Sequence, residues 1–68
     1  MIDARGLSCP IPVVMVQKEV KAASPDELQV MVDARVCVEN ITRYARLQHY
    51  SVTVEENGGE YTMTLKKE

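Results

Sequence analysis

The thiol of Cys9 is the candidate nucleophile of this sequence, because it stands between a short turn and the start of a predicted helix. The N-terminal end of a helix carries partial positive charge and stabilises a nearby anion. A cysteine placed there has a lowered pKa and a larger share of thiolate, which is the reactive form. A persulfide on the same sulfur is also an anion and gains from the same field. The alternative is that Cys9 is a small buried residue with a structural role.

Pro10 and Pro12 follow this cysteine and shape the first turn of the helix. Proline is tolerated there because the first N–H groups of a helix have no partner within it. The two prolines leave the N–H groups of Ile11 and Val13 as the donors that could face an anion. They also stiffen the turn, so we expect the sulfur to be exposed.

The turn itself is predicted over residues 5–9, where Gly6 can take a positive φ at no steric cost. Arg5 is the basic side chain nearest to Cys9 in the sequence. Its guanidinium could pair with the sulfur anion, and the alternative is a solvated turn residue.

Three apolar residues of the predicted helix, Ile11, Val14 and Met15, fall outside its inward-facing stripe. An exposed apolar patch beside a reactive sulfur is a candidate docking surface for a partner. The alternative is that loops or the sheet edge cover these side chains.

The other soft side chains have simpler interpretations. Cys37 lies at the edge of the inward stripe of a second predicted helix, which indicates a packed, unreactive thiol. The alternative is a resolving thiol that condenses with Cys9. His49 suits the C-terminal end of that helix as a cation. Two cysteines and one histidine are too few for a four-ligand zinc site, so neither a metal nor another cofactor is expected.

The chain has 68 residues, enough for a single domain over residues 1–68. A domain of this size buries only about 60% of its unfolded surface, which leaves no room for an enclosed substrate cavity. Any chemistry should therefore lie on the surface and depend on a partner protein.

Charge and hydropathy exclude other classes. The net charge is −2, with acids and bases mixed, and no basic stripe of the kind that binds nucleic acid stands out. No apolar run approaches the ~20 residues of a membrane span. The N-terminus does not read as a secretory signal. We therefore expect a cytoplasmic protein with reduced thiols, no nucleic-acid partner and no membrane association.

Hydrophobic periodicity predicts six elements and two turns. In chain order they are a strand at 2–4, a turn at 5–9, a helix at 12–23, a strand at 28–33, a helix at 35–49, a strand around Val52 and Val54, a hairpin turn at 57–59 and a strand at 61–65. Each of the last three strands has one apolar and one largely polar side, which fits a sheet covered on one face only. The expected fold is an α/β two-layer open sandwich, βαβαββ, with a four-stranded mixed sheet and two helices on one face.

The helical spacing also predicts which residues face the core. The inward stripe of the first helix would be Val13, Val16, Val20 and Ala23, and that of the second Val38, Ile41, Tyr44 and Ala45. Asp33 could cap the second helix. The acidic residues flanking the hairpin are interpreted as a solvated edge that discourages sheet association; they are Glu55, Glu56 and Glu60.

The string Asp3-Ala4-Arg5-Gly6-Leu7-Ser8-Cys9-Pro10-Ile11-Pro12 closely resembles the signature of the TusA/SirA/YedF family of sulfur-carrier proteins. The resemblance extends over the whole chain in length and element order. It implies a βαβαββ sandwich similar to the C-terminal domain of bacterial translation initiation factor three. Residues 32–33, 39–45 and 50–56 are most similar to the YedF-type branch, which is linked to selenium metabolism and often carries a second, C-terminal domain.

The resemblance also implies a role for each motif residue. Cys9 would accept sulfur, or selenium, from a cysteine desulfurase or another sulfurtransferase and pass it to a downstream relay protein. Pro10 and Pro12 match the motif prolines, and Gly6 and Asp3 match the upstream positions. The chemistry is sulfurtransferase-like, although the chain would serve as a protein substrate shuttling between enzymes.

Two other hypotheses stay open from the sequence. One is a non-catalytic regulatory or interaction module in which Cys9 is structural. The other is RNA binding by analogy of fold, which the lack of an evident basic surface disfavours. Whether the chain is a stand-alone protein or a fragment of a longer one is left open.

Overall fold

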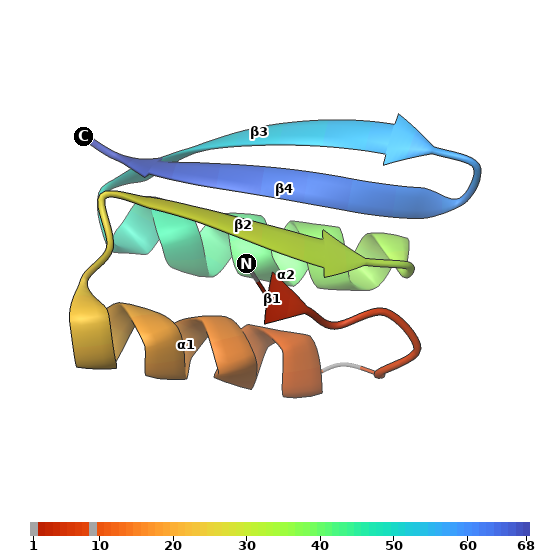
Figure 1. The fold of residues 1–68 in the computed structure, drawn as a ribbon, viewed down its shortest axis with the longest axis horizontal. Coiled ribbons are helices and arrows are strands. Elements are labelled where there is room, and N and C mark those ends of the chain that lie inside the picture. Colours follow the sequence, from red (N-terminus) through yellow and green to blue (C-terminus); the bar gives the residue numbers. More distant parts are fainter. Residues whose placement is uncertain (1, 9) are drawn as a thin grey trace.

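The alternation of apolar and polar residues along the strands builds a four-stranded sheet with one face against two helices (Figure 1). The structure is a computed structural model that describes residues 2–8 and 10–68. The elements are β1 (Ile2–Asp3), α1 (Ile11–Ala23), β2 (Glu27–Val32), α2 (Arg35–Leu47), β3 (Tyr50–Asn57) and β4 (Glu60–Lys67). The strand order is β1-β2-β4-β3, with β1 parallel to β2 and the other pairs antiparallel. The predicted βαβαββ sandwich with a mixed sheet is therefore confirmed.

The centre of the core lies where β2 pairs with β4. Leu28 is opposite Leu65, and Val30 is opposite Met63. All four side chains are buried. Residues directly opposite in an antiparallel pair share a face and contact each other, so these two pairs form one continuous apolar strip beneath the helices.

The second helix packs on this strip with the predicted stripe. Cys37, Val38, Ile41 and Ala45 are buried, and Tyr44 is half-buried against them. The spacing of three and four residues places them on one side of the helix, as the period of 3.6 requires. The exposed side of α2 is consequently left to the polar residues between them.

The first helix buries part of its predicted stripe and adds Pro12 to it. Its buried residues are Pro12, Val16 and Val20, whereas Val13 is only half-buried and Ala23 is exposed. The four-residue spacing from Pro12 onward fits the core better, because the apolar proline ring takes the inward position of the first turn. Ala23 is the last residue of the helix, and Ser24 ends it in the left-handed conformation with a φ of 42°. The inward position predicted for Ala23 is therefore wrong, whereas Val13 is partly buried and packs against the core.

The hairpin between β3 and β4 turns at Gly58 and Gly59, which have φ values of 61° and 86°. Two successive positive φ angles define the tight turn whose twist matches the strands, and glycine adopts them without strain. The predicted turn at 57–59 is confirmed. Among the described residues, neither helix is long and apolar enough to cross a membrane.

Candidate functional site

The loop between β1 and α1 leads to the candidate nucleophile and is fixed to the sheet at its start. The Ala4 N–H donates to the Met31 carbonyl oxygen over 2.8 Å, and the Ala4 side chain is fully buried. Gly6 has a φ of 79°, as the sequence predicts, and its N–H donates to Asp33 Oδ2 over 2.8 Å. The candidate nucleophile itself, Cys9, lies outside the described residues.

Asp33 therefore has a different role from the one predicted. The residue that begins α2 as its N-cap is Ala34, and no side chain caps this helix. The Asp33 carboxylate instead accepts a hydrogen bond from a loop 27 positions away in the sequence. This contact ties the loop to the point where β2 ends and α2 begins.

Arg5 joins the same loop to β1 and β4. Its Nε atom lies 2.9 Å from Asp3 Oδ1, and its Nη2 atom lies 2.9 Å from Asp3 Oδ2. Its Nη1 atom lies 3.4 Å from Glu60 Oε1. The hydrogen bonds from the side chain and backbone of Arg5 lower the pKa of Asp3 from its ordinary 3.8 to about 2. The pairing with Asp3 likewise raises the pKa of Arg5.

The structure thus assigns carboxylate partners to Arg5, which the sequence analysis expected either to pair with the sulfur or to be solvated. Glu60, interpreted as a solvated edge residue, is 48% exposed and in addition pairs with Arg5. Glu60 follows the hairpin turn 55 positions from Arg5, so no local sequence pattern could have linked them. Pairing of Arg5 with the Cys9 sulfur stays a prediction.

The N-terminal end of α1 has features that favour a nearby anion, but one of its expected N–H donors already has a partner. Pro10 is its N-cap, no side chain caps it, and no acidic residue lies in its first turn. However, the Ile11 N–H donates to the Ser8 carbonyl oxygen over 3.0 Å, so this expected donor is already occupied. Both helices begin at the end of the molecule where the loop lies (Figure 1), so their positive dipole ends point the same way.

The three apolar residues beside Cys9 are not equally exposed. Ile11 and Val14 are 49% and 40% exposed, whereas Met15 is half-buried against the core. The predicted exposed patch is therefore reduced to Ile11 and Val14. Pro12, expected as a stiffening motif residue, is fully buried and also anchors α1 to the core.

Cys37 is 1% exposed within the core cluster, in agreement with a packed thiol. His49 follows α2 with a φ of 67°, and its backbone N–H donates to the Arg46 carbonyl oxygen over 3.0 Å. The backbone of His49 thus closes the end of this helix.

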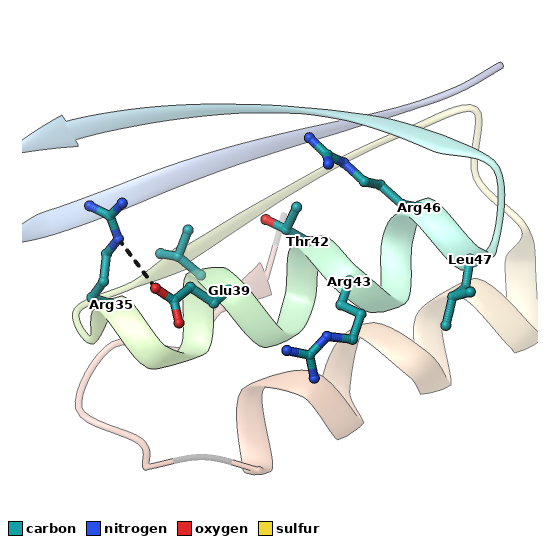
Figure 2. A pocket seen from close by; sticks show the side chains of 7 residues that line it. Arg35, Glu39, Thr42, Arg43, Arg46 and Leu47 are labelled. Carbon is teal, nitrogen blue, oxygen red and sulfur yellow. Dashed lines mark ion pairs between the residues drawn. The ribbon is translucent and has the colours of Figure 1, made fainter.

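Sequence analysis missed a basic surface on α2. Arg35, Arg43 and Arg46 lie along its exposed side and line a shallow groove of about 590 Å³ (Figure 2). They are eight and three positions apart, which brings them to one face of a helix although the linear sequence shows no basic run. A helical projection of residues 35–47 would have revealed this surface, which we call the basic face of α2.

Comparison with known proteins identifies the family. Residues 1–67 match the family described as "Sulfurtransferase TusA". The chain belongs to the TusA family. It is 32% identical over 68 residues to the Methanocaldococcus jannaschii protein named "Putative sulfur carrier protein MJ0990", covering 97% of this chain and 91% of that protein. The crystal structure of a SirA-like protein from Desulfitobacterium hafniense superposes with a TM-score of 0.84 at 28% identity, covering 98% of this chain and 96% of the other.

These similarities confirm the resemblance seen in the motif and the fold that it implied. They support a sulfur-carrier role for this TusA-family chain. They do not distinguish the YedF-type branch from the others, so that finer assignment stays a prediction.

The pair formed by Asp3 and Arg5 predicts a specific pH dependence. Because the folded-state pKa of Asp3 is depressed, its carboxylate stabilises the fold above pH 3.8, and this contribution disappears as the pH falls toward 2. The difference in melting temperature between the wild type and Asp3→Asn should be fully present at pH 6 and shrink progressively as the pH falls from about 4 through about 2. The effect should be small, since the side chains of Arg5 and Asp3 are 40% and 54% exposed.

The measurement is thermal unfolding followed by circular dichroism across this pH range. Asp26→Asn, which removes another exposed carboxylate, is the matched control. An equal pH-dependent difference in both variants would contradict the assignment to the Arg5 pair.

Proposed function

We propose that this protein is a sulfur-relay carrier that holds a persulfide sulfur on Cys9 and passes it to a partner protein. The observation that supports this most is the position of Cys9 in the chain, directly before the N-terminal end of α1. That end has Pro10 as its N-cap and no acidic residue in its first turn. The helix dipole would therefore favour both a thiolate and a persulfide anion on Cys9.

The proposed transfer is a pair of thiolate exchanges with no net oxidation. The Cys9 thiolate attacks the terminal sulfur of a persulfide on the donor, a cysteine desulfurase or another sulfurtransferase. A new S–S bond forms on Cys9, the S–S bond of the donor breaks, and the donor cysteine leaves as a thiolate. A thiolate of the downstream relay protein then attacks the terminal sulfur on Cys9, which leaves as a thiolate in turn. A selenium atom could move by the same exchange.

The surroundings proposed for this chemistry follow from the thiol. A thiol stays free in a reducing compartment, so we propose that the protein is cytoplasmic. Residues 1–68 would act as one domain, with the chemistry on its surface. The small core leaves the partner to enclose the reacting sulfurs.

Cys9→Ser should abolish sulfur loading while leaving the fold nearly unchanged. Intact-protein mass spectrometry after incubation with a cysteine desulfurase and cysteine should show the gain of about one sulfur atom on the wild type only. Supplying a selenium donor in the same assay tests the alternative cargo. The free energy of unfolding should change by about 0.5 kcal/mol or less if the side chain is exposed.

Cys37→Ala is the control, because its thiol is buried and should not carry sulfur. Sulfur gain on Cys9→Ser would contradict the proposal. A large loss of stability in that variant would instead support a structural Cys9 and the alternative of a non-catalytic interaction module.

We also propose that the donor docks on the apolar patch beside Cys9. Ile11 and Val14 are its exposed members. Met15 is partly buried and packs against the core. Protein interfaces place a few apolar side chains in a desolvated centre that dominates the binding energy. A contact here would bring the donor cysteine close to Cys9, which follows Ser8 in the chain.

Val14→Glu should slow sulfur transfer from the donor without changing the alkylation rate of Cys9. The expected loss is about tenfold at low donor concentration, as for burial of an unpaired charge in an interface. Val54→Glu is the matched control, since Val54 is 41% exposed on the edge strand β3. Transfer rate against donor concentration is the measurement. Equal slowing by both variants would place the docking surface elsewhere.

A further inference from the structure

The exposed side of α2 carries an arrangement that the proposed sulfur chemistry does not use. Its groove of about 590 Å³ is lined by Arg35, Val38, Glu39, Thr42, Arg43, Arg46 and Leu47. All seven residues belong to one helix, so their relative positions are fixed by its backbone. The backbone that carries these side chains is therefore preformed.

The arginines of this basic face form only one weak ion pair among the described residues, although Glu56 and Glu68 line adjoining hollows with Arg35 and Arg46. Arg35 Nε lies 4.0 Å from Glu39 Oε2, and the two side chains are 70% and 64% exposed, which makes this ion pair weak. Across residues 2–8 and 10–68, no carboxylate lies within ion-pair distance of Arg43 or Arg46. Arg5 provides the contrast, because its guanidinium is held by Asp3 and Glu60.

The groove has an excess of positive charge, whereas the chain as a whole has an excess of negative charge. Three arginines against one glutamate leave an excess of positive charge on a protein whose net charge is −2. An acidic ligand is thus attracted to this face although the protein as a whole is acidic.

An exposed apolar side chain completes the surface. Leu47 is 70% exposed, the largest value among the exposed large hydrophobic residues. Figure 2 shows Arg43 and Leu47 extending toward α1, and Arg35 and Arg46 extending toward the sheet. Arginine beside a desolvatable apolar side chain is the composition enriched in protein interfaces.

We propose that the basic face of α2 binds an acidic segment of a partner protein, with carboxylates against the arginines and an apolar side chain against Leu47. Arg35 and Arg46 are eleven positions apart, or about 16 Å at the rise of an α-helix, so a partner helix of about three turns would span them. A nucleic acid fits less well, because no aromatic residue lines the groove and its excess positive charge is small.

The basic face of α2 begins close to the residue that holds the loop between β1 and α1. Arg35 lies two residues after Asp33, which holds the loop at Gly6. A segment bound along α2 would therefore have one end beside the loop that leads to Cys9. The binding itself does not depend on sulfur transfer, so the two proposals can fail separately.

A synthetic helical peptide serves as the probe, with glutamates spaced to face the three arginines and one leucine to face Leu47. Fluorescence anisotropy should show binding that weakens with salt. Arg43→Glu and Arg46→Glu should each raise the Kd by about fivefold or more, as expected for the loss of an ion pair worth about 1 kcal/mol. Lys18→Glu is the matched control, because it makes the same charge change on the exposed side of α1.

Chemical-shift changes on peptide addition should concentrate on residues 35–47, and Leu47→Ser should weaken binding with the helix content unchanged. Three results of the peptide measurements would overturn the proposal. They are an absence of binding to the wild type, an equal loss of affinity in Lys18→Glu, and equal binding of a peptide with glutamine in place of glutamate. Tighter binding of a single-stranded RNA of the same charge would also overturn it, by assigning the face to nucleic acid.

Discussion

The hydrogen bond from the Gly6 N–H to Asp33 Oδ2 is the contact on which the candidate site depends. It spans 2.8 Å and fastens the loop before α1 to the junction of β2 and α2. Its acceptor is positioned by core elements, since Val32 is buried immediately before it and α2 begins just after it. Its donor belongs to Gly6, whose φ of 79° a residue with a side chain would adopt only with strain. The packing of the core thereby determines where the chain leading to Cys9 can go.

The chain uses its arginines in two different ways, and the difference separates a structural region from a binding region. Arg5 is held by carboxylates from β1 and β4, so its charge is neutralised locally and its contribution is to hold the loop. The arginines of the basic face of α2 have at most one weak ion pair among them, and their charge is available to a partner. The proposed relay requires contact with at least two proteins in turn, and distinct exposed surfaces would let a small domain bind them separately. We propose the apolar residues at the start of α1 and the basic face of α2 as two such surfaces.

Local periodicity was sufficient to predict the elements and the second helix's core, because Leu28, Val30 and Val32 alternate and Val38, Ile41 and Ala45 repeat at helical spacing. The motif around Cys9 was sufficient to suggest the family that the comparisons confirm. The errors lie where a distant contact outweighed a local preference. Asp33 looks like a helix cap but bonds to Gly6, and Pro12 looks like a turn residue but fills the core. The ion pair between Arg5 and Glu60 and the alignment of the α2 arginines exist only once the chain is folded.

The pKa of the Cys9 thiol tests most directly whether its position before α1 activates it for sulfur transfer. The rate of alkylation of each cysteine, measured against pH by mass spectrometry of the labelled peptides, gives that value. We expect a midpoint for Cys9 below the value of about 8.5 for a free cysteine, because the start of α1 would stabilise the thiolate. Cys37 should react far more slowly at every pH at which the protein is folded, because it is buried. A Cys9 midpoint at or above that of a free cysteine, or equal rates for the two thiols in the native protein, would contradict this expectation.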